Sequence, residues 1–309
     1  MSASRPPSQS PLVYAYLGWM GYNFGLTSPI VGFVVGRLRG LGLEGAPLAV
    51  AALGLLHAMD LLVVAGLAAW LLRRYAIPFS SLNLRASPSL LLLAAGAAAV
   101  DLGQRSFLVP LTETAFGFAP SAVEPASTTY LAARAAGLLI VAPLAEELLF
   151  RGVIYRVSRL YFSAAVAVLM SGFLFGRSHL LTIHSFGAIA ASGVIMAWSY
   201  EKSGTLLVPI VIHVLINASV LAEQAWPQTG SFLRSPLIAS GLLLAGLAAC
   251  RTALGSWRDF GVSWSSPRGE GATASRADWL TWGALAMALA ALVWWARRLL
   301  DAWLGSAFG

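Results

Sequence analysis

Residues 128–151 read TTYLAARAAGLLIVAPLAEELLFR, a long apolar run that ends in two carboxylates and a guanidinium. A bilayer core about 30 Å thick needs roughly 20 apolar residues per helix, so this run is long enough to cross a membrane. An Arg or Asp at the centre of such a helix costs about 2.5 to 3.5 kcal/mol on insertion scales. Charged groups kept at that cost indicate a functional site inside a membrane helix.

The composition of the whole chain supports the membrane assignment. Hydrophobic residues make up 58% of the 309 residues and charged residues 11%, whereas soluble domains contain about 45–50% and 25%. The net charge of +7 comes from 19 Arg and one Lys, which cluster at the ends of apolar runs. That distribution is typical of membrane topology signals. We therefore expect a lipid bilayer around the chain and no nucleic-acid partner.

The apolar runs predict an all-α fold, a polytopic transmembrane bundle of about eight or nine helices. The Glu pair is placed at the far end of its helix, and residues 151–159 and 251–277 are expected in loops. The expected spans are 12–36, 48–72, 88–103, 128–150, 160–178, 180–200, 204–222, 235–250 and 278–298.

Two further polar patterns interrupt apolar runs. They are Phe175-Gly-Arg-Ser-His179 and His213-Val-Leu-Ile-Asn217. A membrane chain that keeps ionisable groups in three separate spans is expected to bring them together, because such groups avoid lipid by facing one another. The three patterns therefore predict a single buried site.

The residue types in these patterns suit hydrolysis. Glu147 and Arg151 are four apart and share a helix face, which favours an ion pair. Glu146 points about 100° away, so its carboxylate stays available as a general base. A Glu and a His could polarise one water, while a His and an Asn could donate hydrogen bonds to a developing oxyanion. These residue types supply the groups needed to hydrolyse a peptide bond with water as the nucleophile.

The three patterns match, in order and spacing, three motifs that occur together in a family of membrane proteases: E-E-x-x-x-R, F-x-x-x-H and H-x-x-x-N. Over roughly residues 130–222 the chain resembles the CPBP intramembrane proteases (CAAX protease and bacteriocin-processing, also called Abi). The resemblance implies a helical bundle similar to that of the CAAX prenyl endopeptidases. It also implies catalytic roles for Glu146 and His179, which would activate water, and for His213 and Asn217, which would support the oxyanion. The supporting positions would be Glu147, Arg151 and Phe175.

The need for a metal stays open at the level of sequence. Glu146, His179 and His213 could hold a divalent ion such as zinc with one position left for water. No H-E-x-x-H motif is present to indicate a zincin geometry, and the family is also compatible with a glutamate–histidine mechanism. The cofactor is therefore unknown, with a divalent metal as one possibility.

We expect an intramembrane endopeptidase whose partner is a membrane-associated protein or peptide substrate. Residues 1–127 would form N-terminal membrane helices, residues 128–222 the catalytic core and residues 223–309 C-terminal membrane helices, all in one integral membrane unit. The usage of Arg over Lys and the abundance of Ala and Gly favour a bacterial inner membrane. The alternatives are a non-catalytic scaffold or bacteriocin-immunity protein with the same fold, and a transporter that uses the buried charges as a proton relay.

Overall fold

The computed structural model describes residues 27–116, 134–179 and 186–262, together with positions 16, 18, 19, 21 and 132. Its described residues form helices and contain no strand, which confirms the predicted all-α fold. The helices are α2 (Thr27–Gly40), α3 (Gly45–Arg74), α4 (Pro88–Phe116), α6 (Ala142–Glu147), α7 (Arg156–Arg159), α8 (Ala164–Ser178), α9 (Phe186–Ser203), α10 (Leu207–Ala225), α11 (Pro227–Leu233) and α12 (Pro236–Leu254), with short 3-10 turns η2 (Phe79–Ser81) and η6 (Trp257–Phe260).

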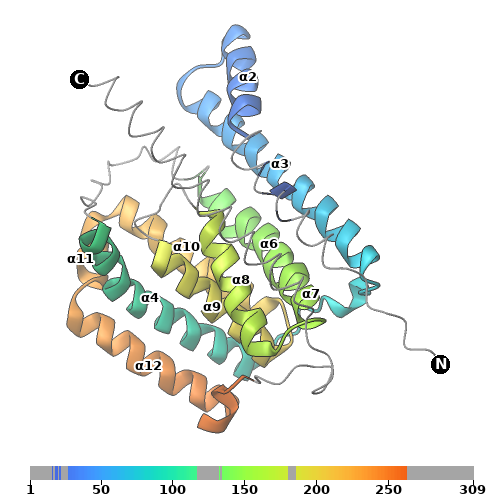
Figure 1. Cartoon of the computed structure of the whole chain (residues 1–309). Coiled ribbons are helices and arrows are strands. Elements are labelled where there is room, and N and C mark those ends of the chain that lie inside the picture. Colours follow the sequence, from blue (N-terminus) through green and yellow to red (C-terminus); the bar gives the residue numbers. More distant parts are fainter. Residues whose placement is uncertain are drawn as a thin grey trace, which may run out of the picture.

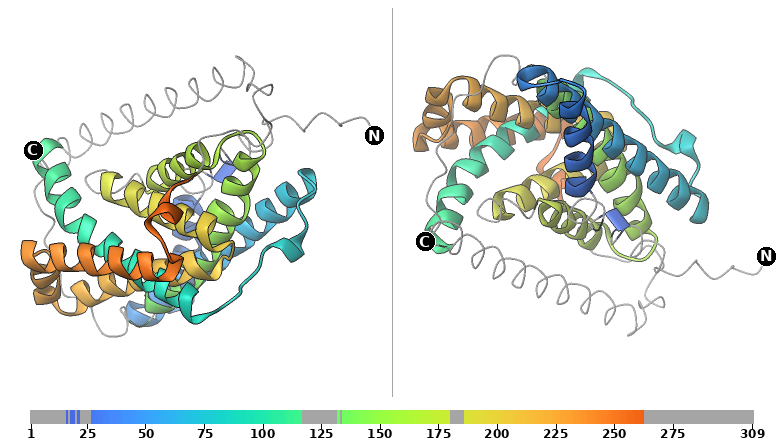
Figure 2. Two further views of the ribbon diagram at one scale, coloured as in Figure 1. Left: turned by 90° about the horizontal axis from the view of Figure 1, so that it is seen from below. Right: turned by 90° about the horizontal axis from the view of Figure 1, so that it is seen from above.

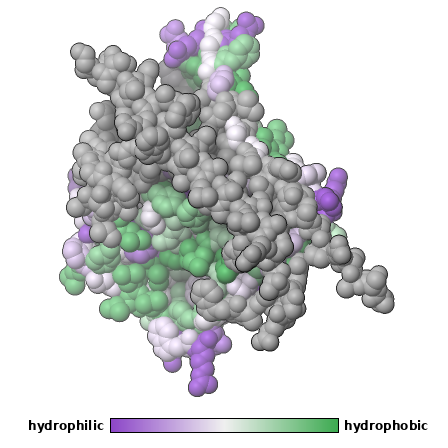
Figure 3. Space-filling view, viewed as in Figure 1, coloured by the Kyte–Doolittle hydropathy of each residue, from purple (hydrophilic) through white to green (hydrophobic). Residues whose placement is uncertain are grey.

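The described helices are apolar enough to lie in a membrane. Four of them contain stretches that are long and apolar enough to cross one: Val50–Arg74, Pro88–Pro110, Leu207–Ala225 and Pro236–Leu254. Leu62, Leu237 and Leu244 leave 70% to 80% of their surface exposed, which suits contact with lipid. Hydrophobic residues cover much of the described surface in Figure 3, with hydrophilic residues at its margins. The chain is an integral membrane protein.

The long helices α4 and α12 lie side by side at one flank of the bundle, and α3 lies at the other (Figures 1 and 2). Glycines let α4 and α12 approach backbone to backbone. A Cβ on Gly96 would stand 2.8 Å from the Gly246 carbonyl oxygen, and a Cβ on Gly246 would stand 2.6 Å from the Gly96 oxygen. Small residues that permit such close crossings drive helix association in membranes.

A second close crossing joins α8 to α9 in the centre of the bundle. A Cβ on Gly172 would stand 2.6 Å from the Val194 backbone nitrogen, and a Cβ on Gly193 would stand 2.8 Å from the Gly172 Cα. The crossing fixes the C-terminal half of α8, which carries the second polar motif, against the middle of α9. It therefore sets where Phe175 and His179 lie.

The central helix of the site runs through residues 137–159 and is not a regular α-helix. It consists of the π-helical stretch η3 (Gly137–Val141), α6, a second π-helical stretch η4 (Leu148–Tyr155) and α7. In the wider turn of η3, Gly137 lies against the His57 ring of α3, where a Cβ would stand 1.8 Å from Nε2. π-Helical turns are rare and are frequent at functional sites.

Three expectations about helix limits need correction. The Glu pair lies in the middle of the helix over 137–159, and residues 151–159 are helical instead of forming a loop. The helix expected over 88–103 continues to Phe116 with Pro110 inside it, because proline in a membrane helix is tolerated where neighbours satisfy the freed carbonyl. The expected span 278–298 and most of residues 12–26 lie outside the described residues, so the number of spans stays a prediction.

Candidate active site

The site is built around a fully buried ion pair on the central helix. Arg151 Nη1 donates to Glu147 Oε1 at 2.8 Å, and both side chains have no exposed surface. The second guanidinium nitrogen, Nη2, donates to the Gly193 carbonyl oxygen of α9 at 2.9 Å. The close crossing of α8 and α9 thus presents a backbone acceptor to the guanidinium, which helps to satisfy this buried charge.

His213 of α10 joins the ion pair from the opposite side. Its Nδ1 lies 2.9 Å from Glu147 Oε1. An ionised carboxylate only accepts hydrogen bonds, so Nδ1 carries a hydrogen and the neutral imidazole has its lone pair at Nε2. Glu147 therefore sets the tautomer of His213 and aims Nε2 toward the neighbouring carboxylate.

That neighbouring carboxylate is Glu146, which faces both histidines as the sequence predicted. Its Oε2 lies 3.8 Å from Nε2 of His179 and 3.9 Å from Nε2 of His213. Oε2 is buried, and among the described residues nothing donates a hydrogen bond to it. The side chains of the three motifs thus converge on one point, although they come from α6, the C-terminal end of α8 and α10.

His179 is held in the same tautomer as His213. It stands directly after α8, and its Nδ1 lies 2.9 Å from the Phe175 carbonyl oxygen one turn earlier. A carbonyl can only accept, so Nδ1 donates and the lone pair of the neutral ring lies at Nε2. Both imidazoles therefore turn an accepting nitrogen toward Glu146.

Phe175 packs at the centre of the site and explains the aromatic position of the second motif. Its ring centroid lies 4.7 Å from Cζ of Arg151, 4.8 Å from the His179 ring and 5.7 Å from the His213 ring. The contact with the guanidinium has cation–π geometry. One buried ring therefore holds the relative positions of three polar side chains.

Asn217 contributes to the site through the backbone of the central helix. Its side-chain nitrogen donates to the Leu138 carbonyl oxygen at 2.7 Å. Leu138 lies in η3, where the π-helical turn changes the usual backbone pairing. Asn217 therefore ties α10 to the widened turn that precedes the Glu pair, and the second hydrogen of its amide group is not used by this bond.

Comparison with known proteins identifies the region that carries these residues. A family model described as type II CAAX prenyl endopeptidase Rce1-like matches residues 128–219, which include all three motifs. This part of the chain, about a third of its length, is similar to the Rce1-like family. The match confirms the resemblance to CAAX proteases drawn from the motifs, and it implies an intramembrane protease of the CAAX type. No curated protein and no solved structure matches the chain.

The donor atoms of this site can be compared with those of a zinc site. Tetrahedral zinc with bonds of about 2.0–2.1 Å keeps its ligand atoms about 3.3 Å apart, whereas the histidine nitrogens stand 3.8 and 3.9 Å from Glu146 Oε2. No group of three or more His, Cys, Asp and Glu in the described part of the chain is arranged to hold an ion. The donor types suit zinc, but the distances suit it less well.

Sequence analysis missed a second polar cluster, on α4, that contacts α9 beside the site. Asp101 is fully buried, and its carboxylate accepts from Arg105 Nε at 2.9 Å and from Gln104 at 3.1 Å. Arg105 also donates to Ser192 at 3.2 Å, next to the glycine whose carbonyl binds Arg151. The spacing of Asp101 and Arg105, four residues apart in an apolar run, was the available signal.

Proposed function

We propose that this Rce1-like chain is an intramembrane endopeptidase that hydrolyses a peptide bond of a membrane-associated protein or peptide. One observation carries the proposal: Glu146 Oε2 lies 3.8 and 3.9 Å from the two histidine nitrogens. These gaps are too long for direct hydrogen bonds and suit a bridging water. Such a water would lie beside the buried Oε2 atom of Glu146, whose side chain is 20% exposed, and next to His179, whose side chain is 33% exposed.

In the proposed reaction Glu146 acts as the general base. It takes a proton from the bridging water while the water oxygen attacks the peptide carbonyl carbon, which leaves a tetrahedral intermediate with a negative oxygen. The carboxylic acid then gives its proton to the departing amine nitrogen as the C–N bond breaks. His179 orients the water, because its Nε2 accepts a hydrogen bond from the second water hydrogen.

His213 and Asn217 are proposed to stabilise the oxyanion. In its imidazolium form, reached by uptake of a proton from solvent before the reaction, His213 can donate from Nε2 to the developing oxyanion while Nδ1 donates to Glu147 at 2.9 Å. The hydrogen of the Asn217 amide not bound by Leu138 can donate in the same way. Arg151 and Phe175 position these groups without touching the substrate. Residues 128–222 would then form the catalytic core.

A divalent metal is kept as an outcome to be tested. If an ion binds, Glu146, His179 and His213 would hold it, and it would supply Lewis-acid activation of water. Incubation of the purified chain with a chelator, followed by elemental analysis and an activity measurement, separates the two cases. Full activity of a metal-depleted chain supports the glutamate–histidine reaction.

The substrate is best sought in the cell. We propose a bacterial inner membrane as the location, from the preference for Arg over Lys in the sequence. Membrane proteomes of strains carrying the wild-type chain, Glu146→Gln or a deletion should be compared. We expect the same precursor to accumulate with Glu146→Gln as with the deletion, and purified wild-type protein should then cleave that precursor.

Glu44→Gln is the matched control, because Glu44 is an exposed carboxylate outside the site. It should leave processing unchanged. A non-catalytic scaffold or immunity protein predicts a different result: Glu146→Gln would behave like the wild type, and only the deletion would alter the membrane proteome. Cleavage of the precursor by purified Glu146→Gln at the wild-type rate would falsify the assignment of Glu146 as the base.

A further inference from the structure

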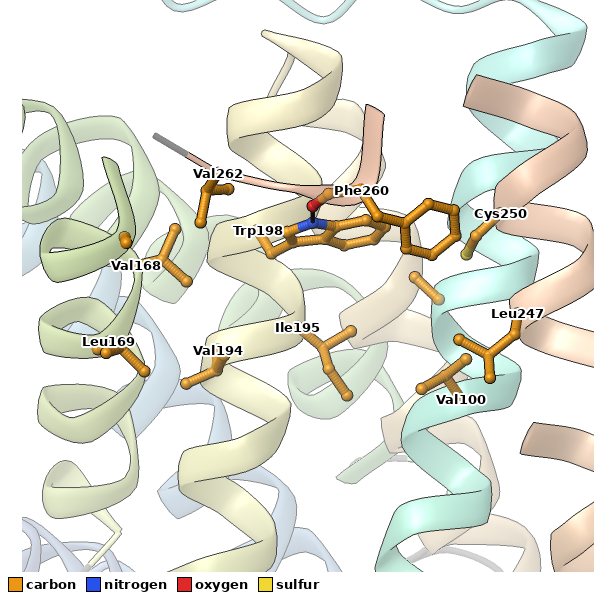
Figure 4. Close-up of a pocket in the computed structure, with 12 residues that line it drawn as sticks. Val100, Val168, Leu169, Val194, Ile195, Trp198, Leu247, Cys250, Phe260 and Val262 are labelled. Carbon is orange, nitrogen blue, oxygen red and sulfur yellow. Dashed lines mark hydrogen bonds between the residues drawn. The ribbon is translucent and has the colours of Figure 1, made fainter. Parts of the chain in front are cut away.

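A wholly apolar groove, which shares no lining residue with the active site, lies beside α9. Its volume is about 320 Å³, and Figure 4 shows α8, α9, α4 and α12 around it. Trp198 and Phe260 lie across one end, where the indole nitrogen donates to the Phe260 carbonyl oxygen at 2.9 Å. The lining residues are all apolar or weakly polar: Ala97, Val100, Ala165, Val168, Leu169, Val194, Ile195, Trp198, Leu247, Cys250, Phe260 and Val262.

The same end of the groove is surrounded by cations and aromatic rings. Lys202 donates to the Gly261 carbonyl oxygen, directly beside the Phe260 segment. Arg251 follows the groove residue Cys250 and places its Cζ 6.0 Å from the Trp257 ring, which in turn lies 4.9 Å from the Phe260 ring. Basic and aromatic residues together are typical of the boundary between lipid and water.

Among the described residues, the charge at this end is mostly positive. Arg251 and Arg258 are both exposed, and Lys202 is half-buried. Asp259 is the acidic residue of η6, and Glu201 on α9 already accepts from Tyr155 and lies 3.9 Å from Arg159. An anionic group is therefore attracted to the rim of the groove, whereas the walls offer no polar partner.

These two features together define the chemistry of an occupant. The walls require hydrocarbon, because a polar group buried there would lose its hydrogen bonds to water without replacement. The rim favours a negative charge, worth about 1 kcal/mol for each Lys or Arg near the membrane surface. We propose that the groove binds an anionic phospholipid, with one acyl chain between α8 and α12 and the phosphate beside Lys202 and Arg251.

Lipid retention by the full-length chain tests this proposal directly. Protein purified in detergent is titrated with phosphatidylglycerol or phosphatidylcholine, and bound lipid is counted by native mass spectrometry. We expect one phosphatidylglycerol per chain to be retained, and phosphatidylcholine to bind at least about fivefold more weakly. Arg251→Gln or Lys202→Gln should each weaken retention of phosphatidylglycerol by about fivefold and weaken phosphatidylcholine less, because the choline cation offsets the charge of its phosphate.

Two further variants test the groove itself. Leu169→Trp and Leu247→Trp enlarge side chains on opposite walls and should lower retention of both lipids. Arg74→Gln is the control, since this exposed cation ends α3 and does not line the groove. It should bind lipid as the wild type does. A melting temperature within a few degrees of the wild type shows that a variant is folded. If a tryptophan variant does not fold, the lipid retention of Arg251→Gln and Lys202→Gln tests the proposal.

Equal retention of the two lipids, unchanged by Arg251→Gln and Lys202→Gln, would overturn the proposal. A full-length chain that retains no phospholipid would also overturn it. The groove would then be filled by residues 263–309 or by a second copy of the chain, which native mass spectrometry would detect as a dimer. No peptidase assay enters the experiment, so its result is independent of the proposed catalytic function.

Discussion

The sharpest prediction concerns Arg151, whose removal leaves a buried carboxylate without its partner. Arg151→Ala deletes the 2.8 Å contact to Glu147, the 2.9 Å hydrogen bond to Gly193 and the packing on Phe175. Breaking a buried pair by removing one member costs about 3–5 kcal/mol. Native proteins are stable by only about 5–15 kcal/mol, so this loss is a large part of the total.

The expected loss can be measured by thermal unfolding in detergent. At about 2–4 °C for each kcal/mol, the scale for domains of 150–250 residues, the melting temperature should fall by about 6–20 °C. Arg258→Ala is the control, because Arg258 is exposed, and it should melt within about 1–2 °C of the wild type.

A double-mutant cycle then separates the ion pair from simple packing. The cycle consists of Glu147→Gln, Arg151→Ala and the double variant Glu147→Gln/Arg151→Ala. Both charges are absent from the double variant, so it should be more stable than Arg151→Ala. A fall of less than about 1 kcal/mol for Arg151→Ala would refute the reasoning. A double variant that is no more stable than the single one would also refute it, because no unpaired charge would then have been relieved.

Three further predictions test other contacts of the same site. Gly172→Ala inserts a Cβ 2.6 Å from the Val194 nitrogen, so it should lower the stability of the chain by about 1–3 kcal/mol in the same melting assay. The control Gly241→Ala has open space around it and should not lower stability. Equal losses of stability in the two variants would contradict the close crossing of α8 and α9. Asn217→Ala leaves a carbonyl in η3 without its donor, so it should cost about 1–3 kcal/mol and lower kcat more than it raises KM on the identified precursor. Asp101→Ala should destabilise the chain and expose α9 amides to hydrogen exchange, and unchanged exchange would argue against the contact between α4 and α9.

The convergence of the three motifs could be predicted from sequence because of the cost of charge in lipid. Glu146, His179 and His213 lie in separate apolar runs, and no arrangement that leaves them facing hydrocarbon is stable. The pair Glu147–Arg151 followed from helix geometry alone, since residues four apart share a face. The lengths of the apolar runs and the composition were also sufficient for the all-α fold.

Other features of the site depend on the packing of distant segments and could not be predicted. The acceptor for Arg151 is a backbone carbonyl of Gly193, and every residue has such a carbonyl, so no side chain marks it. The hydrogen bond from His213 to Glu147 depends on the angle between α10 and the central helix. The expected span 88–103 stopped before Pro110, yet α4 continues through this proline, because tertiary neighbours decide whether a membrane helix tolerates it.

The π-helical stretch η3 makes the site sensitive to chain length as well as to residue identity. A π turn holds one residue more than an α turn, so loss of any single residue between 137 and 141 would restore a regular helix. The helix on either side of the turn would keep its faces, because the extra residue is absorbed within the turn, but the Leu138 carbonyl oxygen would then pair inside the helix. Asn217 would therefore lose the Leu138 oxygen as its hydrogen-bond acceptor. A homologue shorter by one residue here could keep every motif letter and still have lost its chemistry.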